Sequence, residues 1–252
     1  MATTQEAPWQ KAVDTGVRRV LSAFDAGEGR VLALLSAHRK DRSRWSKSSI
    51  DVTMKRVGKV LSDLEIGIIA GLELGAEMAA KSVGGSVQDL SADIQRVKSQ
   101  VARMAAEIRE RITSEARQVI QAARVQKIAK SAAAEMLTGT HLTYGVQTTF
   151  GDRSGKKWKS RTYFEVLADA STMNSGISSF RDKMADVGND IVQVAGPADG
   201  CPKCQPWIGR VLSLTGVTDH PTLDEAMGSG LFHPRCRHHL VHYQPEKDKK
   251  EK

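Results

Sequence analysis

The stretch CPKCQPWIGRVLSL, residues 201–214, contains two of the three cysteines of the 252-residue chain. The third, Cys236, lies in FHPRCRHH, residues 232–239, beside three of the seven histidines. Thiolates and imidazoles at such short spacing are ligands that zinc prefers, because a tight turn directs both side chains at one point. Two such turns, far apart in the sequence, would close a loop around one metal ion and shape the last fifth of the chain.

The predicted ligands form two pairs with the same spacing. Cys201 and Cys204 make the first pair, and His233 and Cys236 make the second. We predict that these four residues bind a structural Zn²⁺, with His238 as the replacement if His233 points away. Four or five candidate ligands favour a closed site over a catalytic site with an open position.

Other interpretations of the cysteines remain open. The cysteines could be reduced and packed, with the histidines solvated. A redox C-x-x-C pair would need a thioredoxin-like βαβ context, and the sequence pattern does not contain one. The H-x-E and H-E-x-x-H patterns of zinc enzymes are also missing from the sequence. We therefore predict no catalytic and no organic cofactor-binding residues.

The charge and hydropathy restrict the partners and the compartment. The chain has 37 Lys and Arg against 29 Asp and Glu, a formal net charge of +8, which suits either a solvated basic surface or a polyanion nearby. No apolar run reaches the ~18–20 residues that span a bilayer. The best candidate, the run of 15 residues from Ile66, contains Glu73 and Glu77. Without a signal-peptide pattern at the N-terminus, we expect synthesis in a reducing cytoplasm and no membrane partner.

The first 138 residues predict a bundle of long helices. Apolar residues recur at helical spacing over residues 10–40 and 49–83. In the second of these helices, Gly67, Gly71 and Gly75 fall every fourth residue on one face. In a soluble chain, that pattern predicts close approach of a neighbouring helix, at a cost of ~1 kcal/mol of helix propensity per glycine.

A third helix is predicted over residues 86–137. Ser86 and Asp89 have the spacing of a capping box. Apolar residues then alternate in steps of three and four from Val87 to Ile108, which is a heptad seam. Two partners for this seam remain open: other helices of the same chain, or a copy or partner in an assembly.

The C-terminal part changes character. Residues 140–160 predict a β-hairpin, residues 161–187 a helix and residues 189–196 a strand. Between the cysteine pairs we expect a turn and strand, then a short helix capped by Thr222 with Glu225 three residues later. The predicted fold is α+β and mainly α: a helical domain over 1–138, a small α+β module with a structural zinc site over 139–245, and a disordered charged tail over 246–252.

Within this module the residues resemble a known family. The pattern resembles the C-terminal signature of phage minor capsid proteins, the head-morphogenesis proteins related to that of phage Mu. The similarity covers about 100 residues, from roughly Thr140 onward. The shared positions are Cys201, Cys204, Pro206, Trp207, Gly209, Ser213, Thr222, Leu223, Ala226, Gly230, Leu231, Phe232, His233, Pro234, Cys236, Arg237 and His238.

Tyr163 and Glu165, on the helix before the strand, also fit the family. The family helix often has an arginine a few residues later, where this chain reads EVLADAS with Asp169. Any role of that arginine is therefore not carried over to this chain.

The resemblance implies a non-enzymatic minor structural protein of a tailed phage. Such a protein would be made in the host cytoplasm and lie inside the capsid near the portal, where it would assist head assembly, DNA packaging or ejection. The implied partners are the portal and other capsid components, with non-specific contact to packaged DNA, in an oligomeric virion assembly.

Two functions from other classes are alternatives to a phage structural protein. An ADP-ribosyltransferase-like or toxin-associated enzyme would need a catalytic glutamate, for which Glu165 is the candidate. A zinc-ribbon DNA-binding regulator would need side chains that read base edges. Between the cysteine pairs, Arg210 is the only basic side chain besides His220, which is a poor basis for such reading.

Overall fold

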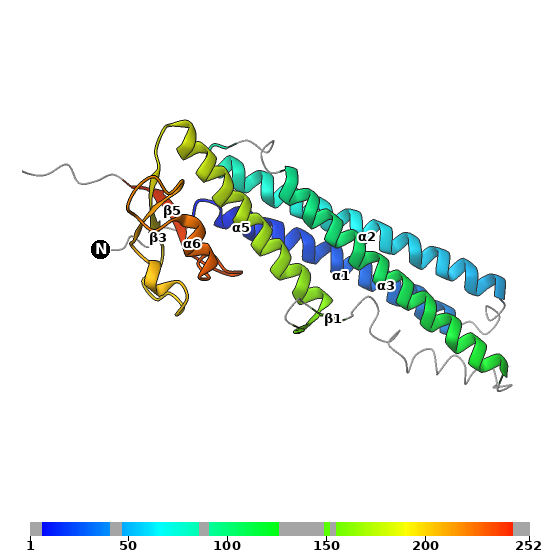
Figure 1. Ribbon diagram of the computed structural model, residues 1–252. Helices are drawn as coiled ribbons and strands as arrows, with labels where there is room; N and C mark the ends of the chain where they lie inside the picture. Colours follow the sequence, from blue (N-terminus) through cyan, green and yellow to red (C-terminus); the bar gives the residue numbers. More distant parts are fainter. Residues whose placement is uncertain (1–6, 41–46, 86–90, 126–148, 152–154, 244–252) are drawn as a thin grey trace, which may run out of the picture. The chain divides into compact units, whose positions relative to one another are not determined.

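The computed structural model describes residues 7–40, 47–85, 91–125, 149–151 and 155–243. The chain forms two compact units, each built from separate stretches of sequence. We name Val17–Leu72 with Gln95–Glu165 the helical unit, and Met1–Gly16 with Glu73–Ile94 and Val166–Lys252 the mixed unit. Long helices followed by a small set of strands confirm the predicted mainly α, α+β class (Figure 1). The predicted domain boundary at residues 138–139 and the tail lie outside the described residues.

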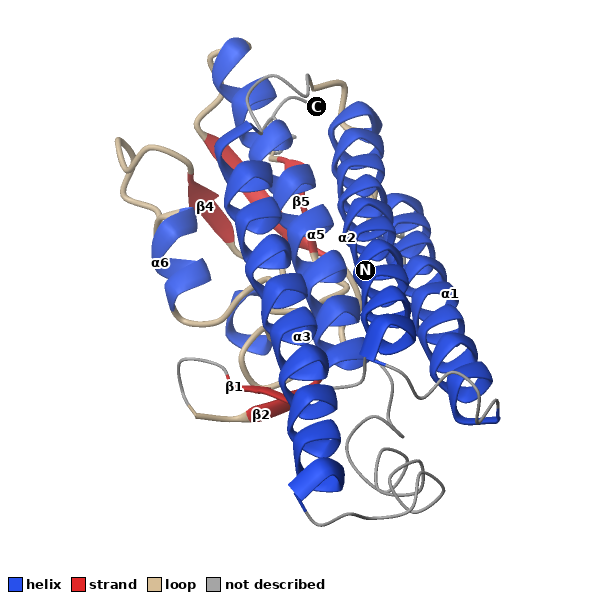
Figure 2. Ribbon diagram, turned by 90° about the vertical axis from the view of Figure 1, so that its right-hand side faces the viewer, coloured by secondary structure: helices blue, strands red, loops and turns tan. Residues whose placement is uncertain are grey.

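Three long helices dominate the helical unit: α1 (Gln10–Lys40), α2 (Lys47–Ser82) and α3 (Ser91–Val125). Within this unit they lie side by side (Figures 1 and 2). The first two confirm the predicted helices to within two residues at each end. Their apolar positions recur at helical spacing and meet in one core. Its buried members include Val20, Phe24, Val31, Leu61, Leu64, Ile68, Val101, Ile108 and Ile112.

The glycines of α2 allow the close helix contacts that their spacing predicts. A Cβ atom on Gly67 would lie 2.8 Å from the Cβ of Ala23. A Cβ on Gly71 would lie 2.8 Å from Cγ2 and 2.9 Å from the backbone nitrogen of Val20. Cβ atoms do not approach this closely, so α1 and α2 can only touch here because Gly67 and Gly71 have no side chain.

The apolar seam of α3 faces the core of the chain. Val101, Met104, Ile108 and Ile112 are all buried. Over this stretch the seam therefore packs within one molecule, as a helix of a bundle does. The proposed capping residues and the continuation of the helix beyond residue 125 lie outside the described residues.

The predicted hairpin follows in the same unit. Strand β1 (Thr149–Gly151) pairs antiparallel with β2 (Lys157–Lys159). Helix α5 (Ser160–Asp186) begins directly afterwards and confirms the predicted helix. Its first turn is tied to α1, because Arg161 donates to both carboxylate oxygens of Asp25 at 2.8 and 3.1 Å.

The mixed unit contains a three-stranded antiparallel sheet in the order β4-β3-β5. The central strand β3 (Ile191–Ala195) pairs with β4 (Val211–Ser213) and with β5 (His239–His242). Strands β3 and β4 agree with the sequence prediction, whereas β5 was not predicted. A 3₁₀ turn, η4 (Gln205–Trp207), and the short helix α6 (Leu223–Gly228) complete the segment between the cysteine pairs.

Among the described residues, no helix is both long and apolar enough to cross a bilayer. The apolar run from Ile66 belongs to α2, where Ile68, Leu72 and Ala76 are buried. This agrees with the prediction of a buried helix.

Candidate metal centre

Two tight turns present the predicted ligands. In the first, the backbone N–H groups of Cys204 and Gln205 both donate to the carbonyl of Cys201 at 2.9 Å. In the second, the N–H of Cys236 donates to the carbonyl of His233, also at 2.9 Å. The first turn brings Cys201 and Cys204 together, whereas His233 and Cys236 of the second turn each approach a different cysteine of the first.

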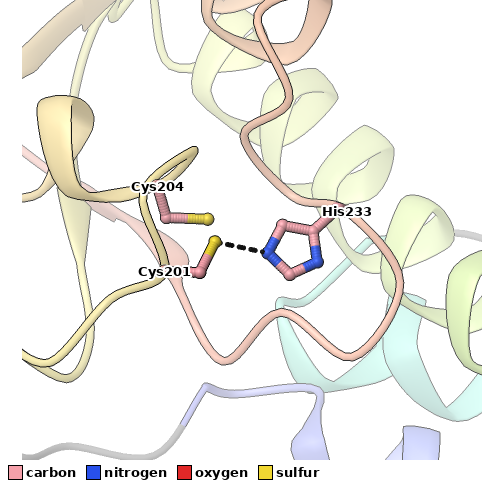
Figure 3. A group of neighbouring side chains, drawn as sticks. All are labelled: Cys201, Cys204 and His233. Atoms are coloured by element: carbon pink, nitrogen blue, oxygen red, sulfur yellow. Dashed lines mark hydrogen bonds between the residues drawn. The ribbon is translucent and has the colours of Figure 1, made fainter.

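The two turns meet. The Sγ of Cys201 lies 3.0 Å from Nε2 of His233 (Figure 3). The Sγ atoms of Cys204 and Cys236 are 3.6 Å apart. A tetrahedral zinc ion with bonds of ~2.0–2.3 Å would separate its ligand atoms by roughly 3.3–3.8 Å. The sulfur pair falls within that range.

His238 also belongs to the cluster. Its Nδ1 lies 3.4 Å from the Sγ of Cys236. The donor atoms fall into two groups that share Cys204: one with Cys201 and His233, the other with Cys236 and His238, and within each group all lie within 4.8 Å of one another. The predicted ligands thus lie in two groups of three donors joined through Cys204, and Cys236 groups with the reserve histidine His238 and not with Cys201 and His233.

Each histidine has its second ring nitrogen held by a backbone carbonyl. Nδ1 of His233 lies 2.8 Å from the oxygen of Pro234, and Nε2 of His238 lies 3.0 Å from the oxygen of Pro197. A carbonyl only accepts, so these nitrogens must carry the protons and donate. In a neutral imidazole this leaves the lone pairs of Nε2 of His233 and Nδ1 of His238 directed at the sulfurs, which is how metal-binding histidines are usually oriented.

The two cysteines of the first turn differ in acidity. The backbone N–H of Cys204 is the main cause that lowers the pKa of Cys201 to about 7. Burial, followed by the neighbouring Cys236, raises the pKa of Cys204 to about 12. A cation would reverse this second effect, because a thiol that coordinates a metal loses its proton. The donor set therefore fits a soft or borderline cation such as Zn²⁺.

An acidic residue on α5 supports the second turn. The backbone N–H of Arg235 donates to Oδ2 of Asp169 at 2.5 Å. Arg235 has a φ of 64°, in the left-handed region that ordinary residues rarely adopt. Asp169 thus holds the turn between His233 and Cys236 in an unfavourable backbone conformation. In the sequence, Asp169 is notable only because it lies where the family often has an arginine.

His239 points away from the cluster. It is 2% exposed, and its ring packs edge-on against Trp9 with centroids 6.4 Å apart. Burial, and then the neighbouring His238, lowers the pKa of His239. Trp9 in turn lies on Gly176 of α5, where a Cβ would come within 2.6 Å of the indole ring. No sequence signal linked Trp9 to His239, since these two residues are 230 positions apart.

The segment between the turns has its own fixed structure. Asp190 accepts from the hydroxyls of Ser213 at 2.5 Å and Thr215 at 2.6 Å, and from the N–H of Thr215 at 2.8 Å. Burial would raise the pKa of Asp190, but these hydrogen bonds outweigh it and lower the pKa. The predicted cap of α6 is confirmed as a complete capping box between Thr222 and Glu225.

Glu165, the candidate for an enzyme, lies elsewhere. It is a half-buried residue of α5 in the helical unit, whereas the five donors belong to the mixed unit. Among the described residues, the clustered metal-binding side chains are those of the two turns.

Comparison with known proteins gives one match. Residues 129–251, nearly half of the chain, match the family model described as Phage minor capsid protein 2. No curated protein and no solved structure matches. The resemblance to phage minor capsid proteins is thereby confirmed, while the relation to the head protein of phage Mu remains a prediction.

Proposed function

Because the C-terminal part of the chain belongs to a family of phage minor capsid proteins, we propose that the chain is a minor component of the head of a tailed phage. The family description supports a structural role in the virion, in association with other phage components. Our proposal goes further: the chain acts inside the capsid near the portal, in head assembly or in DNA packaging and ejection. It works by binding, without catalysis.

A bound Zn²⁺ is the second part of the proposal. Cys201, Cys204, His233 and Cys236 hold the ion, and His238 is the alternative to His233. The observation that carries this part is the meeting of the two turns, with Cys201 3.0 Å from His233 and Cys204 3.6 Å from Cys236. The carbonyl partners of both histidines supply the orientation that such ligands need.

The metal would stabilise the shape of the module. When bound, Zn²⁺ supplies coordination bonds to thiolates and imidazole, and binding of this kind contributes on the order of 10 kcal/mol to folding. The 28 residues between Cys204 and His233 hold little regular structure besides η4, β4 and α6. Joining the two ends of this segment through the metal would fix its position on the module, so that a capsid partner can recognise its surface.

Metal analysis tests the zinc site. Untagged full-length protein, purified without added zinc or chelator, should contain one zinc per chain by elemental analysis. Cys204→Ser should lose it. With Co²⁺ in place of Zn²⁺, the tetrahedral absorption bands should shift in either His233→Ala or His238→Ala, whichever removes the nitrogen ligand. Protein without metal, or Cys204→Ser with full zinc content, would contradict the proposal.

A phage that carries the gene tests the structural role. Purified heads should contain the chain in few copies by quantitative mass spectrometry, and protease added to intact heads should leave it uncut. Cross-linking should join it to the portal protein. Heads without the chain would refute the proposal, and cleavage on intact heads would refute the internal position.

A further inference from the structure

The basic charge of the chain is concentrated in one of its two units. Among the described residues, the helical unit has 20 Lys and Arg against 9 Asp and Glu, a balance of +11. The mixed unit, which contains all five metal-site donors, has 8 against 12, a balance of −4. The described parts of the two units therefore carry net charges of opposite sign.

Part of this charge forms a patch on α2. Lys55, Arg56 and Lys59 are all exposed. Lys55 and Lys59 are four residues apart and so lie one above the other on the helix.

A second basic patch lies on the hairpin. Lys157 and Lys159 are exposed on β2, and alternate residues of a strand point to the same side. The Nζ of Lys156 lies 4.0 Å from the centroid of the Trp158 ring, on the other side of the strand from Lys157 and Lys159. The hairpin thus presents three cations within four residues.

We propose that the helical unit binds double-stranded DNA through its phosphates, without sequence preference, and that the acidic mixed unit does not. Basic side chains spread over a helix and a hairpin suit a polymer that carries one charge per ~1.7 Å better than they suit a compact ligand. The choice of DNA among polyanions rests on the proposed function, because DNA is the polyanion inside a phage head. The division of charge gives the two units different partners: DNA for the helical unit and protein for the mixed unit.

Two triple variants of the full-length, zinc-loaded chain provide the test. K55Q/R56Q/K59Q removes three charges from the helical unit. K81Q/K183Q/R210Q removes three charges from exposed residues of the mixed unit and serves as the matched control. Binding to a 30-base-pair duplex of arbitrary sequence is measured by fluorescence anisotropy at several salt concentrations, with circular dichroism to verify equal helix content.

The helical-unit variant should bind DNA on the order of tenfold or more weakly, and its salt dependence should flatten by up to ~0.9 in log–log slope per lost phosphate contact. The control should bind like the unchanged chain. The inference would be overturned if both variants bound DNA equally weakly, or if the unchanged chain did not bind DNA at 50 mM salt. It would also be overturned if the unchanged chain bound polyglutamate or anionic lipid vesicles as tightly as it binds DNA. A chain found inside heads that binds no DNA would overturn this inference alone, while a chain absent from heads would overturn the proposed function instead.

Discussion

The contact between Asp169 and the second metal-binding turn makes a specific prediction about metal affinity. Asp169→Ala removes the carboxylate that accepts from the N–H of Arg235. Arg235 lies between His233 and Cys236, so any change of its backbone moves both predicted ligands. The substitution should therefore weaken zinc binding although Asp169 is not itself a ligand.

The size of the effect follows from two contributions. A hydrogen bond to a charged acceptor is worth ~1.5–3 kcal/mol. The left-handed conformation of Arg235, with φ of 64°, costs ~1–2 kcal/mol and is maintained by that bond. Arg235 is exposed, so water can partly replace the carboxylate and the net loss should be about 1–2 kcal/mol. At 1.4 kcal/mol per factor of ten, zinc should bind roughly 5- to 30-fold more weakly.

Competition with a chromophoric zinc chelator at neutral pH measures this change. Asp169→Asn keeps a carbonyl oxygen that can accept the bond, so it should retain most of the affinity. Asp186→Ala removes a carboxylate from the exposed end of the same helix and should have no effect. If Asp169→Ala binds zinc within twofold of the unchanged chain, the turn does not depend on this hydrogen bond and the reasoning is wrong.

Three further predictions concern the rest of the fold. Chelation of the metal should raise amide hydrogen exchange over residues 201–243, because the two turns lose their link, and unchanged exchange there would show that no metal holds them. Gly71→Ala should force α1 and α2 apart, which should lower the free energy of unfolding by ~1–3 kcal/mol and lower Tm. At Gly58 a Cβ atom meets nothing within 4 Å, so Gly58→Ala should raise the free energy of unfolding by up to ~1 kcal/mol and raise Tm. Equal changes in Tm for the two variants would contradict the close packing at Gly71. Asp190→Ala should cost ~1–3 kcal/mol in urea unfolding. Because the pKa of Asp190 is lowered, its stabilising effect is present above ~pH 4 and is lost only as the pH falls through the folded-state pKa. The difference in unfolding free energy between the unchanged chain and Asp190→Ala should therefore be the same at pH 8 and pH 6. A smaller difference at pH 6 would refute an ionised Asp190.

Local patterns in the sequence were sufficient for much of this protein. Helical periodicity predicted α1, α2 and α5 because burial of an apolar face is decided every three to four residues. The capping box of α6 was predicted because Thr222 and Glu225 interact within one turn. The prediction of four metal ligands rests on the same kind of local pattern, since C-x-x-C and H-x-x-C each describe one tight turn, and it remains a prediction.

Other features exist only because distant parts of the chain meet. Strand β5 has four residues and forms because β3 offers it a free edge, which no local pattern reveals. His238 joins the cluster and His239 packs on Trp9, although the two are adjacent, because successive residues of an extended chain point to opposite sides. Asp169 supports a turn 66 residues away. The sequence by itself determined which segments fold and which residues can bind a metal, whereas only the tertiary structure decided how those residues are oriented and supported, since these contacts depend on proximity in space and leave no periodic trace along the chain.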